Sequence, residues 1–414
     1  MKMRTKIVGI LICMLLMVAT LVVTGDVNIG DDTIPPTTTI QLSGEIGNQG
    51  WYVSNVEVTL IATDEGSGVN YTRYKLDDGN WTNYTILFNV NIDGYHTVYY
   101  YSVDYDGNVE EEKSRDFKID QTPPTTTHTF SPPDPDGENG WYVNVSSGMV
   151  TLSASDNTSG CTTTWYRIDE EIWKLYTKPF VISSDGWHTV QYYTFDVAGN
   201  QEDTHSIEEI KIDRTKPETT YSLTGELGDN GWYVSDVEME LISRDATSGI
   251  WHTYYRIEDG EWQEYTDPFV LSEENEHVVE YYSVDMAGNE ETHKSATVKI
   301  DKTGPTIDIR TPLKGYLYFF GVKTLRVSSV WSVILGRITI EPSAIDIISG
   351  IDRVEFYVDG MLVSSVIEEP YTWNWNITSI FEPYILTVIA YNQAGFSNSI
   401  QSKLFVLTLG GDRK

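Results

Sequence analysis

The segment Tyr192–Glu202, YYTFDVAGNQE, takes an aromatic stretch directly into an acidic loop that contains glycine. Just upstream and within it, Val190, Tyr192 and Thr194 alternate with residues such as the polar Gln191. Alternation with a period of two is typical of a β-strand that buries one face. We therefore predict a strand whose Val190, Tyr192 and Thr194 side chains face a core, followed by a tight turn.

The same strand and loop recur along the chain. They read HTVYYYSVDYDGN, HTVQYYTFDVAGN and EHVVEYYSVDMAGN, and a divergent fourth copy closes with AYNQAGF. GWYV also occurs three times, at Gly50–Val53, Gly140–Val143 and Gly231–Val234. A repeat of about 90 residues has the size of one small β-sandwich, and is too long for a propeller blade or a solenoid coil.

Proline-containing segments mark the boundaries between the repeats, as in KIDQTPPTTT and KIDRTKPETT. They predict repeats at 34–120, 121–213 and 214–301, and a divergent fourth domain at 302–409. Strand-like runs broken every 8–12 residues by Gly, Asp, Asn or Ser, without helical periodicity outside the N-terminus, predict an all-β chain. Because proline favours extended backbone, the linkers should be short and stiff and should join the domains end to end.

The N-terminus has the pattern of an export signal. Lys2, Arg4 and Lys6 precede an apolar run from Ile7 to Val23, so residues 1–25 are predicted to be a signal peptide or a retained N-terminal anchor. Outside this leader the only cysteine is Cys161, so no intrachain disulfide is available there.

Charge and sequons fit a protein outside the cell. The formal net charge is −33, from 28 basic and 61 acidic residues, which disfavours nucleic acid and anionic lipid as partners. Contact with a membrane is expected only through an uncleaved leader. Six Asn-x-Ser/Thr sequons are possible glycosylation sites, at Asn70, Asn80, Asn83, Asn144, Asn157 and Asn376. The predicted location is extracellular or at the cell surface.

Taken together, the D-x-x-P-P-T opening, GWYV, D-x-x-SG and D-x-AGN-x-E resemble the Ig-like repeats of bacterial and archaeal surface proteins, including the spirochaete outer-membrane repeats named after a "beta-barrel" domain. The resemblance covers about residues 34–301. SGIDRVEFYVDG at Ser349–Gly360 and PYTWNWN at Pro370–Asn376 are similar to another bacterial Ig-like module. It implies a tandem array of Ig-like or fibronectin-III-like β-sandwich domains, used elsewhere as spacers, adhesins or appendages to enzymes.

The D-x-AGN loop has two interpretations. Asp196 can accept hydrogen bonds from the backbone of its own turn, and Gly199 and Asn200 tolerate positive φ, so a structural turn is the first. Calcium is the alternative, because Asp and Asn oxygens suit it, with Glu202 as a further candidate. The candidate ligands in the three copies are Asp104, Asn108, Asp196, Asn200, Asp285 and Asn289. We favour the turn, because no D-x-D-x-D-G ladder is present, and expect folding without calcium or any other cofactor.

The D-x-x-SG loop is predicted to be a turn capped by its aspartate. Its residues are Asp64 and Gly68, Asp156 and Gly160, Asp245 and Gly249, and Asp346 and Gly350. His96, His188 and His277 share one repeated strand position, which favours core or cross-strand packing over catalysis.

No nucleophile elbow, His-x-x-x-His pair or phosphate-binding glycine loop is present in the sequence. The predicted function is therefore a non-enzymatic spacer or adhesion module whose partner is an extracellular protein or glycan. The alternative is a carbohydrate-binding repeat protein that uses exposed aromatic residues, with Trp51, Trp141 and Trp232 as sugar-stacking candidates; packing at the sheet edge is the other interpretation of these tryptophans.

Overall fold

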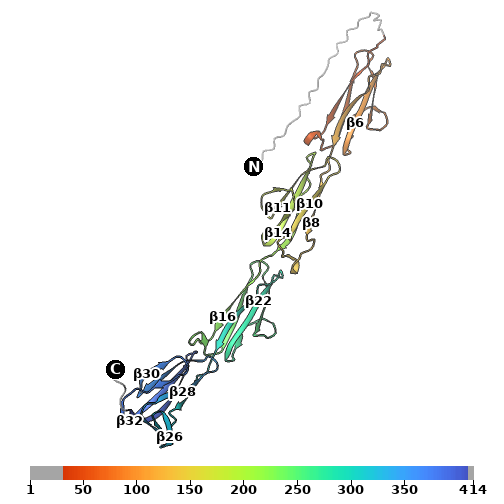
Figure 1. Cartoon of the computed structure of the whole chain (residues 1–414). Helices are drawn as coiled ribbons and strands as arrows, with labels where there is room; N and C mark the ends of the chain where they lie inside the picture. The colour runs from red at the N-terminus through yellow and green to blue at the C-terminus, as the bar shows by residue number, and fades with distance from the viewer. Residues whose placement is uncertain (1–30, 409–414) are drawn as a thin grey trace, which may run out of the picture. The chain divides into compact units, whose positions relative to one another are not determined.

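The computed structural model describes residues 31–408, and in this part of the chain the fold is all-β. The predicted leader at residues 1–25 lies outside the described residues. Among the described residues, none forms a helix long and apolar enough to cross a membrane. The strands build a tandem series of β-sandwiches, as the repeat pattern predicts (Figure 1).

The first sandwich contains seven strands and one short 3-10 segment. These are β1 (Thr37–Ser43), η1 (Asn48–Gly50), β2 (Val56–Thr63), β3 (Val69–Leu76), β4 (Thr82–Tyr84), β5 (Phe88–Val90), β6 (Gly94–Asp104) and β7 (Lys113–Ile119). The order β1-β2-β5 forms one sheet and β4-β3-β6-β7 the other.

The second and third sandwiches repeat this plan with one extra edge strand. The second contains β8 (Thr125–Ser131), η2 (Glu138–Gly140), β9 (Trp141–Tyr142), β10 (Met149–Ser155), β11 (Cys161–Ile168), β12 (Lys174–Leu175), β13 (Phe180–Val181), β14 (Gly186–Asp196) and β15 (His205–Ile212). The third contains β16 (Glu218–Thr224), β17 (Trp232–Tyr233), β18 (Val237–Arg244), β19 (Ile250–Ile257), β20 (Gln263–Glu264), β21 (Phe269–Leu271), β22 (Asn275–Asp285) and β23 (Lys294–Ile300). The two sheets of the second sandwich have the orders β13-β10-β8 and β12-β11-β14-β15-β9. Those of the third sandwich have the orders β16-β18-β21 and β17-β23-β22-β19-β20.

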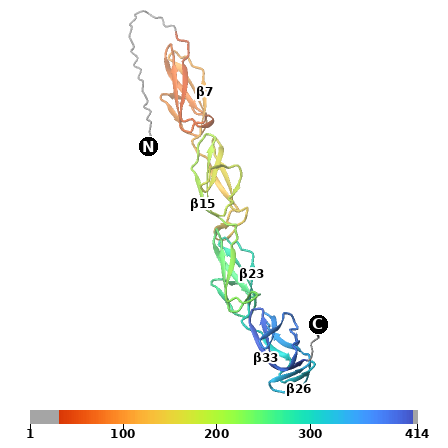
Figure 2. The ribbon, with the colours of Figure 1, turned by 90° about the vertical axis from the view of Figure 1, so that its left-hand side faces the viewer.

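The fourth sandwich has a larger second sheet. It contains β24 (Thr306–Thr311), β25 (Tyr316–Phe319), β26 (Val322–Arg326), β27 (Trp331–Leu335), β28 (Thr339–Ile345), β29 (Ile351–Val358), β30 (Met361–Val366), β31 (Trp373–Asn374), β32 (Ser379–Asn392) and β33 (Ser397–Thr408). The orders are β24-β28-β31 and β26-β25-β27-β33-β32-β29-β30. The three strands β25, β26 and β27, which lie between β24 and β28 in the sequence, enlarge the second sheet. Figure 2 labels the closing strands β7, β15, β23 and β33, one in each sandwich.

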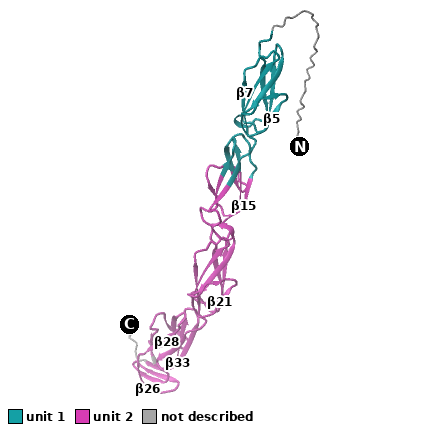
Figure 3. Cartoon of the chain, turned by 90° about the vertical axis from the view of Figure 1, so that its right-hand side faces the viewer, with its two compact units in different colours: residues 1–127, 153–165, 193–204 teal, residues 128–152, 166–192, 205–414 magenta. Residues whose placement is uncertain are grey.

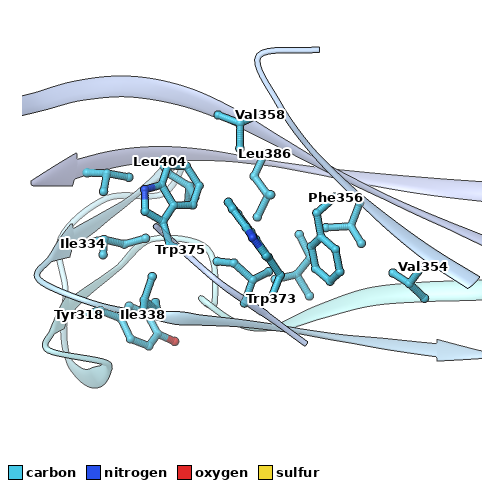
Figure 4. Packing of buried hydrophobic residues seen from close by; sticks show 14 of the residues in the cluster. Tyr318, Ile334, Ile338, Val354, Phe356, Val358, Trp373, Trp375, Leu386 and Leu404 are labelled. Atoms are coloured by element: carbon cyan, nitrogen blue, oxygen red, sulfur yellow. The ribbon is translucent and has the colours of Figure 1, made fainter. Parts of the chain in front are cut away.

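Each sandwich buries its own apolar cluster, and no cluster mixes residues of two sandwiches. In β14 the predicted faces are confirmed: Val190, Tyr192 and Thr194 are buried and Gln191 is half-buried. In the apolar cluster of the fourth sandwich, Trp373 points towards Phe356, and Trp375 lies beside Ile334 and Leu404 (Figure 4).

By their contacts, the residues group into two compact units (Figure 3). One comprises residues 1–127, 153–165 and 193–204, and the other residues 128–152, 166–192 and 205–414. The first sandwich lies in the former, the third and fourth lie in the latter, and the second contributes to both.

Consecutive sandwiches touch through the same pair of loops at three places, each place lying within one unit. We call the loop before the GWYV tryptophan the junction loop (residues 47–50, 137–140 and 228–231) and the strand-end loop of the next sandwich the AGN loop (residues 197–200, 286–289 and 393–396). The backbone N–H of the junction loop donates to the carbonyl of the AGN-loop alanine, from Asn48 to Ala198 at 2.6 Å, from Glu138 to Ala287 at 2.8 Å and from Asp229 to Ala394 at 3.1 Å.

Glycine is required on the junction loop because the two backbones meet so closely. A Cβ added to Gly47 would lie 2.2 Å from the Ala198 carbonyl oxygen, and one added to Gly228 would lie 2.4 Å from that of Ala394. The AGN glycine is restricted as well: Gly199 has φ +106°, and a Cβ there would lie 2.9 Å from Asn48 Nδ2. The recurring glycines thus permit contact between successive sandwiches.

Candidate metal centre

Three of the sandwiches gather aspartates at the end where the chain enters them. One aspartate comes from the entering linker, one from the D-x-x-SG loop and one from the end of the strand that leads into the AGN loop. The three triads are Asp32, Asp64 and Asp104; Asp120, Asp156 and Asp196; and Asp213, Asp245 and Asp285. Within each triad, one ligand oxygen of every residue lies within 4.8 Å of the others.

The linker aspartate is held by backbone N–H groups on both sides. Asp120 Oδ1 accepts from Thr122 N at 3.3 Å, and its Oδ2 accepts from Ser159 N at 3.0 Å. Ser159 belongs to the D-x-x-SG loop, so this bond attaches the linker to the sandwich that it enters. Asp213 makes the equivalent bonds to Thr215 N and Ser248 N.

The strand-end aspartate closes the AGN loop. Asp196 Oδ1 accepts from Gly199 N at 2.6 Å and Asn200 N at 2.8 Å, and Oδ2 accepts from Asn200 Nδ2 at 2.7 Å. Asn200 Nδ2 also donates to the carbonyl oxygen of Asp120 at 2.9 Å. The asparagine therefore links the turn to the incoming linker.

The third aspartate caps its own loop, with the geometry expected of an Asx turn. Asp156 Oδ1 accepts from Thr158 N at 3.1 Å and from Gly160 N at 2.6 Å. Asp245 Oδ2 does the same for Thr247 and Gly249, whereas its Oδ1 is buried and has no hydrogen-bond partner.

The second and third triads concentrate negative charge away from water, because two aspartates in each are buried, whereas the first triad has one buried aspartate. Asp120, Asp213 and Asp285 are 0% exposed, and no Lys, Arg or His within the described range forms an ion pair with any of the nine carboxylates. Burial, with the neighbouring aspartates, raises the pKa of Asp120, of Asp213 and of Asp285.

In the first triad the pKa values of two aspartates, Asp32 and Asp104, are lowered instead of raised. Burial raises the pKa of Asp104, but hydrogen bonds from Asn108 and Gly107 outweigh it, so the net shift of that pKa is downward. The pKa of Asp32, which is partly exposed, is lowered by backbone hydrogen bonds from Ile34 and Ser67.

The raised pKa values predict how stability depends on pH when divalent ions are chelated. Because the folded-state pKa of Asp285 lies above its unfolded value of about 3.9, the folded state binds the proton more tightly. Its contribution to the free energy of unfolding is fully present below about pH 4 and is lost as pH rises through the folded pKa. In urea titrations with chelator, Asp285→Asn should therefore show a smaller loss of stability from pH 4 to pH 7 than the parent. The exposed Asp259→Asn should match the parent, and equal slopes for all three chains would contradict the prediction.

The fourth sandwich builds the same arrangement with one amide. Asn392 occupies the strand-end position, and its Nδ2 donates to Asp301 Oδ2 and to Asp346 Oδ2, each at 3.0 Å. A neutral donor thus lies between the two remaining carboxylates, where the other sandwiches place a third negative charge.

The chemistry of the triads suits a hard cation. Clustered carboxylate and carbonyl oxygens are the ligands that Ca²⁺ prefers, and no thiolate or imidazole belongs to any triad. Of the calcium candidates predicted from sequence, Asp104, Asp196 and Asp285 lie in the triads. Asn108, Asn200 and Asn289 instead donate their amide N–H to those aspartates.

Glu202, the further calcium candidate, lies in a different cluster, so that suggestion is wrong. Its carboxylate accepts from Thr126 N at 2.9 Å and from Thr126 Oγ1, whose hydroxyl also contacts Thr194. Glu110 and Glu291 occupy the same buried position in the first and third sandwiches. The last residue of D-x-AGN-x-E therefore anchors the first strand in each of the first three sandwiches.

The repeated histidines bridge strands inside each sandwich. His188 Nδ1 lies 2.9 Å from Asp169 Oδ2, and Nε2 lies 2.9 Å from the Ser184 carbonyl oxygen. His96 and His277 make the equivalent contacts and are equally buried.

Trp51, Trp141 and Trp232 are only 2%, 5% and 6% exposed, so the interpretation of these residues as sugar-stacking platforms is wrong. In the second and third sandwiches the tryptophan and tyrosine of GWYV form a short edge strand parallel to the closing strand. The six sequon asparagines are all exposed.

One family model supports an Ig-like fold for part of the chain. Residues 331–388 match the family model of a bacterial Ig domain. No curated protein matches the chain. Fibronectin(III)-like modules of CbhA from Clostridium thermocellum align at 16% identity over 47% of this chain and 99% of theirs, with a TM-score of 0.24.

Two longer structures also align. Extracellular cadherin domains 1–5 of protocadherin gamma B2 share 13% identity over 93% of this chain and 78% of theirs, with a TM-score of 0.28. A 1.5-MDa bacterial ice-binding adhesin aligns at 15% identity over 70% of this chain and all of its own, with a TM-score of 0.24. At these identities the likeness concerns the fold alone.

Proposed function

We propose that the protein is an exported, non-enzymatic surface protein whose tandem sandwiches act as a structural spacer or adhesion module. The observation that carries this proposal is the repeated contact between junction loop and AGN loop. Two buried polar residues recur in the first three sandwiches, and both make contacts inside their own sandwich. The glutamate accepts hydrogen bonds from a first-strand threonine, and the histidine contacts an acidic side chain in the turn after the neighbouring strand.

The contact does what a spacer needs, because it restricts the orientation of one sandwich on the next. The third and fourth sandwiches show it inside a single unit: Asp229 N donates to Ala394 O, and Asn230 Nδ2 donates to Gln393 O at 3.0 Å. Ala394 is 1% exposed under this contact. A flexible Gly/Ser tether would leave the two orientations independent.

The first sandwich differs at the corresponding position. Asp106 stands where the other AGN loops have alanine, and its carboxylate accepts from Asp32 N at 2.9 Å. This loop is closed by its own linker instead of by a preceding junction loop. The exposed Asp106 thus distinguishes this loop from Ala198, Ala287 and Ala394, each of which is buried under its neighbour.

Spin labels test the restriction in the full chain. In a background without the two native cysteines (Cys13→Ser and Cys161→Ser), labels on cysteines introduced at the exposed Glu261 and Met361 report the distance between the third and fourth sandwiches. We expect one narrow distance distribution. Gly228→Ala should widen it about twofold or more, because the new Cβ would clash with the Ala394 carbonyl oxygen.

Gly304→Ala is the matched control. It changes a glycine at the same junction, in the linker that enters the fourth sandwich, but the nearest atom to its Cβ would be Phe396 Cβ at 3.5 Å, which is ordinary contact. A broad distribution in the parent, or an unchanged one in Gly228→Ala, would remove the main support for a spacer.

Export is tested separately. Antibody labelling of intact producing cells should equal that of permeabilised cells if the protein lies at the surface. Labelling that requires permeabilisation would contradict the location.

A carbohydrate-binding role has one specific observation in its favour. A half-buried tryptophan lies on the outer face of the larger sheet in three sandwiches, beside a basic side chain. Lys75 Nζ lies 5.4 Å from the ring centroid of Trp81. Arg167 Cζ and Arg256 Cζ each lie 4.9 Å from the ring centroids of Trp173 and Trp262, respectively. A glycan-array signal that falls on triple substitution of these tryptophans by alanine would favour this function over a pure spacer.

A further inference from the structure

We propose that the three aspartate triads are divalent-cation sites of calcium type, and that Asn392 closes the corresponding position of the fourth sandwich permanently. The chain would then contain three cation-dependent linker attachments and one that needs no cation. Cation binding would stand even if the protein served as a glycan binder instead of a spacer.

The first argument is the missing counter-charge. In the second and third triads two of the three aspartates are buried, so their carboxylates repel one another more strongly than they would in water, and no basic side chain of the described residues pairs with any triad. Backbone N–H groups satisfy most of their oxygens. Asp245 Oδ1, however, is buried and has no hydrogen-bond partner, which leaves one buried carboxylate oxygen of the third triad unsatisfied.

The second argument comes from the fourth sandwich. The same linker and loop positions are occupied by Asp301 and Asp346, and the Asn392 amide donates to both carboxylates at 3.0 Å. Its Nδ2 also donates to the Thr303 carbonyl oxygen at 2.9 Å. The position between the two carboxylates is therefore one that a positively polarised group fills. In the other three sandwiches the strand-end residue is an aspartate, and we infer that a bound cation takes the place of this amide.

The ligand chemistry selects the class of ion. All side-chain ligands are carboxylate oxygens, from the linker, the D-x-x-SG loop and the end of a strand, and such oxygens are the ligands that Ca²⁺ prefers. Zn²⁺ and Cu²⁺ favour nitrogen and sulfur ligands, and none is present in the triads. Water molecules and loop carbonyls would complete the coordination.

The position of the ion predicts what it does. The linker aspartates Asp120 and Asp213 are the last charged residues of one sandwich, while their triad partners belong to the next. A cation would therefore attach the linker to the sandwich that it enters. Removal of the ion would free the linker without breaking either apolar core.

Calcium titration of the chelator-treated full chain tests the sites. Isothermal calorimetry in 0.15 M NaCl, which screens the diffuse negative surface, should give about three Ca²⁺ per chain. Asp196→Asn and Asp285→Asn should each lower the number by one, because each puts an amide where Asn392 has one. Asp203→Asn, at an exposed position close to the second triad in sequence, should leave it unchanged.

The decisive variant gains a site. Asn392→Asp recreates an aspartate triad with Asp301 and Asp346, and should raise the number to about four. It should also make the thermal transition of the fourth sandwich respond to calcium, which in the parent it should not. No saturable binding, the same number after both Asp→Asn substitutions, or no gain with Asn392→Asp would overturn the proposal.

Discussion

Glu291→Ala should lower the free energy of unfolding of the third sandwich by about 3–5 kcal/mol. The Glu291 carboxylate is 5% exposed and accepts from Thr219 N at 3.1 Å, from Ser283 N at 2.9 Å and from the Thr219 hydroxyl. Truncation leaves these buried donors without an acceptor, and each unsatisfied buried group lowers the free energy of unfolding by about 1–3 kcal/mol. It also leaves Lys294, whose Nζ lies 3.0 Å from Glu291 Oε2, without its acidic partner.

The neighbouring Glu290 provides the matched control. Its carboxylate is 57% exposed, and its ion pair with His293, at 3.5 Å, lies in water. Exposed pairs contribute about 0–1 kcal/mol, so Glu290→Ala should change little. Urea unfolding of both variants measures the difference. Equal effects would show that the buried carboxylate does not anchor the first strand.

The sequence predicted the sandwich repeats because their signals are local. In Val190–Thr194 every second residue is buried, and the same pattern recurs at a regular interval in three copies. The strand and the length of the repeat can therefore be predicted without knowledge of contacts between distant residues. The turn residues were equally local. Asp156 and Asp245 accept from the backbone of their own loops.

The aspartate triads were only partly accessible to sequence reasoning, because they are non-local. Asp120 precedes Asp156 by 36 positions and Asp196 by 76, and only the closing of the sandwich brings their carboxylates together. The linker aspartate was interpreted as a boundary marker. A signal was nevertheless present: the linker, D-x-x-SG and D-x-AGN aspartates recur together in three copies, and the fourth changes only the last, to Asn392.

The junction contact was hidden for a different reason. Gly228 precedes a recognisable turn, and nothing local separates a glycine needed for a turn from one needed for close approach. Only the distance of 2.4 Å from its added Cβ to the Ala394 carbonyl oxygen identifies the second role. Trp232 was ambiguous in the same way, because its own strand, β17, pairs with β23, which lies far along the sequence.

Phe356→Ala should lower the free energy of unfolding of the fourth sandwich by about 3–5 kcal/mol. Phe356 is fully buried, and its ring centroid lies 5.9 Å from that of Trp373. Alanine would remove most of its apolar surface and leave a cavity beside two tryptophans that cannot both move into it.

The loss should remain in that sandwich, because its cluster shares no residue with those of the others. Calorimetry of the full chain should therefore show one transition moving to lower temperature while the others keep their midpoints, and Met361→Ala, at a side chain 74% exposed, should move none. A common shift of all transitions would show that the junction loops couple the sandwiches into one folding unit. Because a single backbone hydrogen bond contributes only about 0.5–1.5 kcal/mol, much less than the energy of an apolar core, we expect the junctions to orient the sandwiches without merging their unfolding.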